Sequence, residues 1–157
     1  MIRIEEIPVS RIDEFFTIQY QYLIDEGILE NDEEKEYFRS PEYREAIKSL
    51  MIPEIDRLHM VYFARDGVRI GAAQFLTFRS EDGKCFILDF WVFPTYRGKG
   101  TGHRCFECLE EYTQADGALY YEINCDGQEN RVRFWKSLGF VENGDDEHGV
   151  PLYIRKP

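Results

Sequence analysis

DFWVFPTYRGKGTGH, residues 89–103, is the stretch of sequence that decides the fold of this chain. It overlaps an almost wholly apolar segment, residues 85–93, in which Asp89 is the only charge and which Pro94 ends. Such a run is expected of a central strand that is buried on both faces. A glycine-rich loop follows, and then a helix is predicted through about Gln114. Glycines let consecutive backbone N–H groups point into one concavity, and a helix start adds its positive dipole end. The stretch therefore predicts a backbone cradle for a phosphate group.

Two other nucleotide-binding loops fit the stretch poorly. A Walker loop would need glycine and then Ser or Thr where the chain has Phe93 and Gly100. The dinucleotide fingerprint G-x-G-x-x-G would need glycine at the position of His103, and it normally opens a domain. A plain turn without a ligand is the remaining alternative. The charges of Arg97 and Lys99, set among alternating glycines, favour a phosphate site over that plain turn.

Periodicity and turn signals predict the other elements. Asp66-Gly67 indicates a two-residue hairpin turn, because Asp and Gly tolerate the positive φ angles of a type I′ turn. Ser10 is predicted to cap a first helix that ends near Gly27, and Ser40-Pro41 to open a second helix. The acidic segment Asp25 to Glu36 is expected to be a solvated loop or helix face. Further strands are predicted at residues 1–7, 58–65, 68–78, 118–125 and 150–155, and a last helix at residues 129–138.

The order of these elements is β-α-α-β-β-β-α-β-α-β. It predicts a mixed sheet with helices on its faces. Because the sequence shows no internal repeat and no linker, we expect a single domain over residues 1–157.

The charge balance bears on the partners of the chain. The formal net charge is −11, with 30 acidic residues against 19 basic ones. This disfavours nucleic-acid binding, which depends largely on Lys and Arg. It favours cationic small molecules or peptides, since a negative field attracts them, although an acidic surface also serves solubility alone.

Signals for a membrane, a disulfide or a metal are weak. No apolar run approaches the roughly 18 residues of a membrane span, and the first residues do not form a signal peptide. We therefore expect a cytoplasmic protein without a membrane partner. The pair Cys105-x-x-Cys108 falls inside a predicted helix with no nearby His, so no metal site is predicted. Reduced thiols are expected for all four cysteines: Cys85, Cys105, Cys108 and Cys125.

Two motifs resemble the GNAT family of N-acetyltransferases. The acyl-CoA signature of that family, R/Q-x-x-G-x-G/A, is met by Arg97, Gly100 and Gly102, and residues 89–100 look like its strand-and-loop segment. Residues 134–140 are similar to its second signature. The resemblance implies an α/β (α+β) fold: a mixed, mostly antiparallel sheet of six to seven strands, splayed at the acyl-CoA site, with helices on both faces.

The resemblance also implies acetyl-CoA as the acyl donor. Main chain of Phe90, Trp91 and Val92 would pair with the pantetheine arm, and the Val92 N–H would stabilise the oxyanion. Residues at the start of the later helix would line the CoA: Gln128, Asn130 and Arg131. The pyrophosphate would be held by Arg97 and the loop after it: Gly98, Lys99, Gly100, Thr101, Gly102 and His103.

Asp89 is the first candidate for deprotonating or orienting the amine. Burying an unpaired carboxylate is costly, so its place in an apolar strand needs a reason, and burial tends to raise its pKa toward a useful range. The alternative is a structural Asp that is bonded to backbone N–H groups or to an Arg. Glu122, on the neighbouring predicted strand, is the second candidate, and the two could act through a water molecule.

The family's general acid is a Tyr at the position where this chain has Trp135. An indole N–H donates but is not usefully acidic, so Trp135 could orient the sulfur without supplying a proton. The proton for the departing thiolate would then come from water or from another hydroxyl, or the reaction would use no general acid. The other hydroxyls considered are Tyr96, Tyr121 and Ser137.

The sequence thus predicts an enzyme that moves an acetyl group from acetyl-CoA to a primary amine of a small molecule or peptide, by direct attack. Its alternative is a non-catalytic acyl-CoA-binding module, which the replacement of the usual Tyr by Trp135 keeps open. A cationic amine is the expected acceptor, no nucleic acid is expected, and a homodimer is compatible with the sequence.

Overall fold

Seven strands form one mixed sheet in the computed structural model, which describes residues 1–157. The strand order is β1-β2-β3-β4-β5-β7-β6, and β4 and β5 are the one parallel pair among antiparallel neighbours. This confirms the predicted mixed, mostly antiparallel sheet. The strands are β1 (Ile2–Glu6), β2 (Leu58–Arg65), β3 (Val68–Thr77), β4 (Lys84–Val92), β5 (Tyr120–Asn124), β6 (Val141–Asp145) and β7 (Pro151–Arg155).

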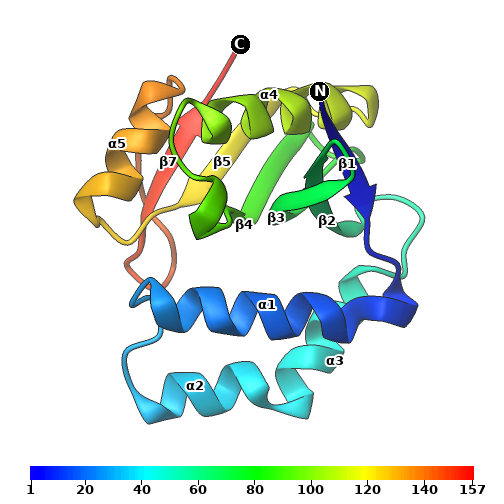
Figure 1. The fold of residues 1–157 in the computed structure, drawn as a ribbon, viewed down its shortest axis with the longest axis vertical. Coiled ribbons are helices and arrows are strands. Elements are labelled where there is room, and N and C mark those ends of the chain that lie inside the picture. Colours follow the sequence, from blue (N-terminus) through cyan, green and yellow to red (C-terminus); the bar gives the residue numbers. More distant parts are fainter.

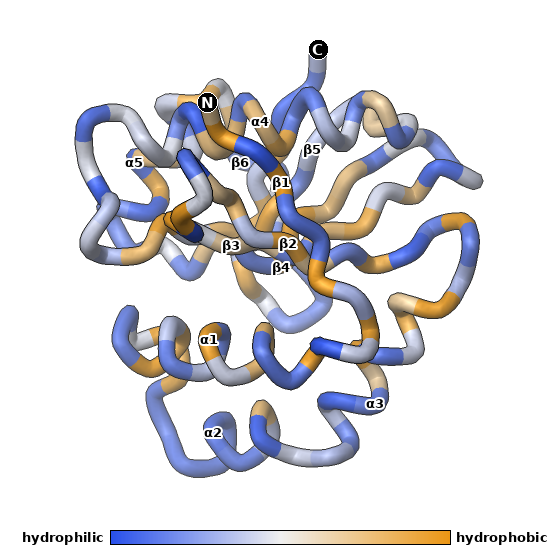
Figure 2. The backbone as a smooth tube through the Cα atoms, turned by 45° about the vertical axis from the view of Figure 1, so that its right-hand side comes forward, coloured by the Kyte–Doolittle hydropathy of each residue, from blue (hydrophilic) through white to orange (hydrophobic).

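Helices cover both faces of the sheet, as predicted (Figure 1). On one face lie α1 (Ile12–Asp25), α2 (Asp32–Arg39) and α3 (Pro41–Leu50), and on the other lie α4 (Thr101–Ala115) and α5 (Glu129–Ser137). Each face has its own hydrophobic core, of 13 buried residues on the α1 side and 18 on the α4 side. Figure 2 shows hydrophobic segments along the central strands, whereas α2, which buries no residue, is hydrophilic almost throughout.

Three local turn and cap predictions are confirmed. Asp66 and Gly67 have φ angles of 52° and 78° in the β2–β3 hairpin. The Ser40 hydroxyl accepts a hydrogen bond from the Tyr43 N–H at 3.2 Å and caps α3. Gly139 (φ 93°) follows α5. These features depend on neighbours in the sequence, which is why the sequence predicts them.

Two local predictions need correction, whereas the prediction for the acidic segment holds. Ser10 does not cap α1, because it lies within a short 3-10 turn, and the helix begins at Ile12 without a side-chain cap. The acidic segment is a loop and a solvated helix, as predicted, since Asn31 and Glu34 form a capping box that opens α2, which buries no residue. Strand β6 was not predicted: all of its residues are exposed, so it has no hydrophobic alternation, and pairing with β7 alone defines it.

Two further expectations concern the state of the cysteines and the presence of a membrane span. All four cysteines are free thiols, as expected. None of the helices combines the length and the apolar character that a membrane span requires.

The sheet splays between its two parallel strands. Lys84–Ile87 of β4 pairs with Tyr120–Ile123 of β5, and beyond Ile87 the two strands are no longer paired. Leu88 is an extra residue opposite β3, because Ile87 pairs with Phe75 and Asp89 with Gln74. Such a bulge bends a strand. The prediction that this strand is buried on both faces is therefore wrong at Leu88, which is 37% exposed.

Candidate active site

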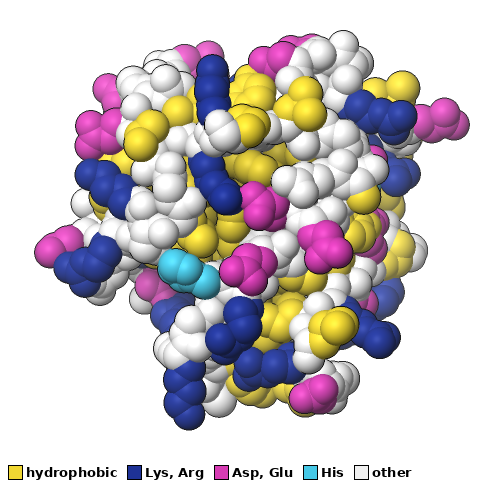
Figure 3. Space-filling view, turned by 90° about the horizontal axis from the view of Figure 1, so that it is seen from above, with side chains coloured by type: hydrophobic (Ala, Val, Ile, Leu, Met, Phe, Trp, Pro, Cys, Tyr) yellow, Lys and Arg dark blue, Asp and Glu magenta, His cyan; other side chains and the backbone are white.

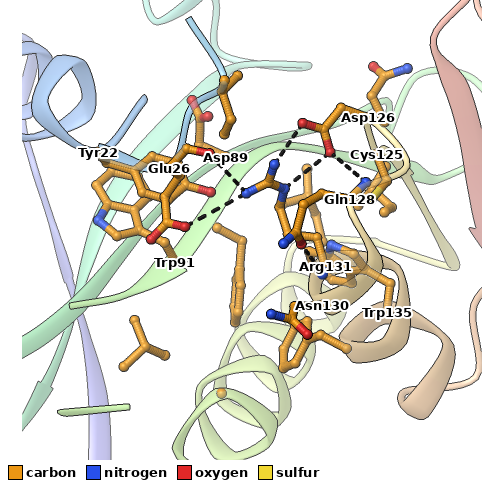
Figure 4. Close-up of a pocket in the computed structure, with 18 of the residues that line it drawn as sticks. Tyr22, Glu26, Asp89, Trp91, Cys125, Asp126, Gln128, Asn130, Arg131 and Trp135 are labelled. Atoms are coloured by element: carbon orange, nitrogen blue, oxygen red, sulfur yellow. Dashed lines mark hydrogen bonds and ion pairs between the residues drawn. The ribbon is translucent and has the colours of Figure 1, made fainter. Parts of the chain in front are cut away.

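A cavity of about 800 Å³ lies where β4 and β5 diverge (Figure 4). Its walls come from α1, β4, the loop before α4, β5 and α5. Most residues that the sequence singled out line it: Asp89, Phe90, Trp91, Val92, Arg97, Gly98, Gly100, Gly102, His103, Gln128, Asn130, Arg131 and Trp135.

Three of the singled-out residues do not line the cavity: Lys99, Thr101 and Glu122. Thr101 is buried, and its hydroxyl donates to the Gly98 carbonyl at 2.8 Å, so it stabilises the loop from within. Glu122 is also buried, and its two carboxylate oxygens accept from Lys84 Nζ and Asn143 Nδ2, each at 3.3 Å. The structure therefore does not bring Glu122 together with Asp89.

The loop before α4 leaves most of its N–H groups without protein acceptors. The Thr101 N–H donates to the Gly98 carbonyl at 3.1 Å. N–H groups at a helix start, with the positive end of the helix dipole behind them, are suited to bind an anion. The N–H groups that donate to nothing within the protein are those of Gly98, Lys99, Gly100, Gly102 and His103.

The two signature glycines of this loop are required for different reasons. Gly100 has a φ of 74°, in the left-handed region that side chains disfavour, and it directly precedes α4. Gly102 is already helical, and a Cβ on it would lie 2.7 Å from Cε1 of Phe134 on α5. Gly100 therefore shapes the turn, while Gly102 lets α4 and α5 approach each other.

The free edge of β4 presents N–H groups to the cavity. Phe93 N–H donates to Ile70 O at 2.8 Å, and so it points toward β3. Successive N–H groups of a strand point to opposite sides. Those of Val92 and Phe90 therefore point away from β3, into the gap where no strand pairs with β4.

Asp89 is a half-buried carboxylate in the cavity wall. Its Oδ2 accepts hydrogen bonds from Nε2 of Gln19 at 2.7 Å and from Nε2 of Gln74. Burial raises the pKa of Asp89 to about 6, although these two hydrogen bonds act to lower it. At neutral pH the carboxylate is therefore mostly ionised, and its proton affinity is much higher than that of an ordinary Asp.

Glu26, just after α1, links the loop before α4 to α5. Its Oε1 lies 2.8 Å from Arg97 Nη2, and its Oε2 lies 3.7 Å from Arg131 Nη1. Arg131 is also held by Asp126 at 2.7 Å, so that its guanidinium lies between two carboxylates (Figure 4). Arg97 Nε donates to the Val92 carbonyl at 2.8 Å. Arg97 is thus held in the cavity wall by a carboxylate and a backbone carbonyl.

Glu26→Gln is expected to loosen residues 26–31, because a neutral amide keeps neither ion pair. A partly exposed ion pair contributes up to about 1 kcal/mol, so backbone amides there should exchange hydrogen roughly 5-fold faster. Hydrogen-exchange mass spectrometry measures this, with Glu30→Gln as the matched control, since Glu30 has no ion pair. Equal exchange in the two variants would show that Glu26 does not hold the segment.

Aromatic rings line both sides of the cavity. Tyr22 stacks on Trp91 with ring centroids 4.4 Å apart and planes 9° apart. Burial, together with the nearby Asp89 carboxylate, holds the pKa of Tyr22 well above its usual value. Trp135 packs edge-on against Phe90 (5.4 Å), and its indole N–H donates to no acceptor in the protein.

Sequence reasoning missed the residues that α1 contributes. Tyr22 and Glu26 line the cavity, and Gln19 is 2% exposed beside Asp89. A signal was present, because Gln19 lies in the apolar stripe of α1 at four residues from both Phe15 and Leu23. A polar residue inside such a stripe indicates a buried polar contact.

A family model for the acetyltransferase (GNAT) family matches residues 20–140. The chain belongs to the GNAT acetyltransferase family. The match confirms the resemblance to this family that the loop sequence indicated. The gap between β4 and β5 agrees with the splayed sheet that the resemblance implied. Among curated proteins, none matches the sequence.

Solved structures of other proteins share this fold at low sequence identity. The PaiA N-acetyltransferase of Thermoplasma acidophilum, solved in complex with coenzyme A, is 16% identical, with a TM-score of 0.75 over 100% of this chain and 99% of that one. An acetyltransferase from Thermus thermophilus is 12% identical, with a TM-score of 0.70 and coverage of 100% and 97%. N-acetylglutamate synthase of Neisseria gonorrhoeae, complexed with coenzyme A and N-acetyl-glutamate, is 19% identical, with a TM-score of 0.65 over 99% of this chain and 35% of that one.

The hydroxyls that could replace the usual Tyr of the GNAT family lie outside the cavity. Tyr121 is bonded to the Thr113 hydroxyl at 2.7 Å, and Ser137 to His103 Nε2 at 2.8 Å. Tyr96 does not line the cavity either. None of the three therefore lines the cavity of this GNAT protein.

Proposed function

We propose that this GNAT protein is an acetyl-CoA-dependent N-acetyltransferase that acts on a primary amine. The observation that carries the proposal is that one cavity holds both a base and an anion cradle. Asp89 lies in its wall, and four loop residues with unpaired N–H groups line the same cavity: Gly98, Gly100, Gly102 and His103. A carboxylate of raised pKa at such a place is suited to general-base work.

The residues of the cavity fit acetyl-CoA. The unpaired N–H groups of the loop suit the pyrophosphate, and the free edge of β4 suits a pantetheine arm, which pairs like an added strand. Gln128, Asn130 and Arg131 complete the wall at α5. Neighbours of the same fold solved with coenzyme A support this proposal. Acetyl-CoA supplies a thioester carbonyl and a thiol leaving group.

The chain contributes three groups to the transfer. Asp89 Oδ1, which has no hydrogen-bond partner in the protein, takes the proton of the amine as its nitrogen forms the new amide bond. The Val92 N–H donates to the developing oxyanion, a type of contact that contributes strongly to catalysis. The indole N–H of Trp135 donates toward the sulfur, and water supplies the proton of the thiol.

A cationic amine is the proposed class of acceptor. Two acidic segments, residues 25–36 and residues 142–147, approach the cavity. Glu26 of the first lines it, and Asp146 of the second accepts a hydrogen bond from the cavity residue Asn124 at 3.0 Å. Residues 25–36 hold seven acids and one lysine. By contrast, Lys and Arg are interspersed with Asp and Glu on the α4 and α5 side of the molecule (Figure 3). The negative field is therefore expected to be concentrated toward α1 and α2.

For a cationic acceptor, kcat/KM is expected to fall on the order of tenfold as salt rises from about 0.1 M to about 1 M. The Debye length then shrinks from about 10 Å to about 3 Å, so steering by the acidic segments is lost. Steady-state kinetics at a series of KCl concentrations measure the effect. A kcat/KM that does not change with salt, or a neutral acceptor that is used equally well, would contradict a cationic substrate.

The proposed function is tested by a screen of amines with acetyl-CoA, in which the loss of thioester absorbance is followed. Polyamines, aminoglycosides, amino acids and peptides form the panel, and acetyl-CoA without amine is the blank. Turnover above the blank is the expected result. Tight acetyl-CoA binding without turnover of any amine would instead favour the non-catalytic acyl-CoA-binding module.

A further inference from the structure

Two glutamines from different elements converge on one oxygen of Asp89. Gln19 on α1 donates through Nε2 to Asp89 Oδ2 at 2.7 Å. Gln74 on β3, which is the cross-strand partner of Asp89, donates through its own Nε2 to the same Oδ2. Oδ1 has no partner within the protein, and the residue lines the cavity. Two donors therefore hold the carboxylate through Oδ2, and Oδ1 stays free to bind a group in the cavity.

The burial of these amides is unusual for residues that serve packing alone. Gln19 is 2% exposed and Gln74 is 1% exposed. Gln74 also leaves its Oε1 buried without any hydrogen-bond partner. A buried polar atom without a partner destabilises a fold, and an apolar side chain of the same size would avoid this. The amides are explained by what their N–H groups do, which is to donate to Asp89.

The groups that surround Asp89 are neutral or already paired. Tyr43 on α3 accepts from Gln19 Nε2 at 3.2 Å, and burial raises the pKa of Tyr43 to about 12. Tyr22 on α1 is likewise held neutral by burial, which raises its pKa. The charged groups of the cavity are Glu26, Arg97, Asp126 and Arg131, which pair with one another. No cation pairs with Asp89, so its ionised form depends on the two amides.

We propose that Gln19 and Gln74 are positioning residues for the reaction: they anchor Asp89 through Oδ2, aim Oδ1 at the acceptor amine, and stabilise the ionised carboxylate. This inference rests on the proposed function, in which Asp89 is the base. A carboxylate without these donors would keep its proton at a higher pH, since hydrogen bonds to the charged form favour that form.

The test is a pH titration of the Asp89 carboxyl by ¹³C NMR in protein labelled at the Asp side chains. Asp89→Asn identifies the signal. The wild-type pKa is expected at about 6. Gln19→Met and Gln74→Met, which keep side-chain size and remove the donors, should each raise it by roughly one pH unit, a tenfold change in proton affinity. Gln21→Met is the matched control, because Gln21 lies on the exposed side of α1, bonded to Asp25; its midpoint should equal that of the wild type.

A second readout is the acidic limb of the kcat/KM profile, which should move to higher pH in both variants, with the rate at high pH largely kept. A structural role would instead lower the melting temperature and leave both midpoints in place, and that result would overturn the inference. Should Gln74→Met fail to fold, Gln19→Met alone decides, because Gln19 donates to the same oxygen. If the NMR midpoints shift while Asp89→Asn keeps full turnover, the stabilisation of the ionised carboxylate stands, whereas the proposed base fails and with it the positioning role in the reaction.

Discussion

Asp89→Asn is expected to lower kcat by roughly 10²–10³-fold, because a general base contributes a rate factor of about this size. The affinity for acetyl-CoA is expected to stay the same. The amide of Asn cannot take the proton of the amine, yet it fills the same space beside Gln19 and Gln74. Steady-state kinetics and calorimetry with acetyl-CoA measure the two quantities. Asp145→Asn, a change on the exposed strand β6, is the matched control.

The pH dependence gives this variant a second signature. In the proposed mechanism the ionised form of Asp89 is the active one, and the pKa of Asp89 is about 6, so kcat/KM of the wild type should fall as the pH drops through that value. The variant should lose this limb. A wild-type rate in a folded Asp89→Asn protein would return Asp89 to a structural role, and Glu122→Gln would be the next variant to examine.

The same carboxylate should cost stability. The pKa of Asp89 in the folded chain is about 6, against 3.8 for an ordinary Asp. The folded state therefore binds the proton more tightly than the unfolded state, and the free energy of unfolding falls as the pH rises through that window. At pH values above it, Asp89→Asn should be more stable than the wild type, on the order of 1–3 kcal/mol. Denaturant unfolding would measure this gain.

Gly100→Val is expected to weaken acetyl-CoA binding by roughly 100-fold. A β-branched residue in the left-handed region strains the backbone by about 1–2 kcal/mol. If the turn relaxes to relieve this strain, it displaces the N–H groups that bind the anion, and each hydrogen bond to a charged group contributes about 1.5–3 kcal/mol. The nearest atom to a Cβ at this position is Arg104 Nη1 at 3.4 Å, so the fold itself has room for the side chain.

Gly67→Val is the control for this variant. Gly67 has a φ of 78°, and a Cβ added to it would have no atom within 4 Å, so the strain is similar. The hairpin that holds Gly67 is far from the cavity in sequence and lines no part of it. Isothermal calorimetry and thermal unfolding of both variants separate binding from stability. Undiminished affinity in Gly100→Val would rule out the cradle.

Features that depend on near neighbours could be predicted from the sequence. The hairpin at Asp66-Gly67 and the cap at Ser40 follow from φ preferences and from a hydroxyl placed three residues before an N–H. The loop before α4 belongs to the same class. Its glycines, the strand before it and the helix after it are contiguous, so the family and a part of the cavity wall were predictable from residues 89–103.

Features that depend on strand order and on burial could not be predicted in this way. Glu122 and Asp89 were grouped because they lie on neighbouring strands, but which side chains share a cavity depends on where those strands part, and Glu122 lies before that point. Strand β6 has no pattern of its own, because only β7 defines it.

By itself, then, the sequence determined the family, the loop that suits a pyrophosphate and the strand that carries Asp89, since each is encoded within one short segment. Only the tertiary structure decided what surrounds that carboxylate. Gln19 lies 70 residues from Asp89 along the chain. Glu26 meets Arg97 and Arg131 across separations that are longer still. Hydrogen bonds and ion pairs between distant segments depend on the two hydrophobic cores that pack α1 and α5 against opposite faces of the sheet, and no local pattern records that packing.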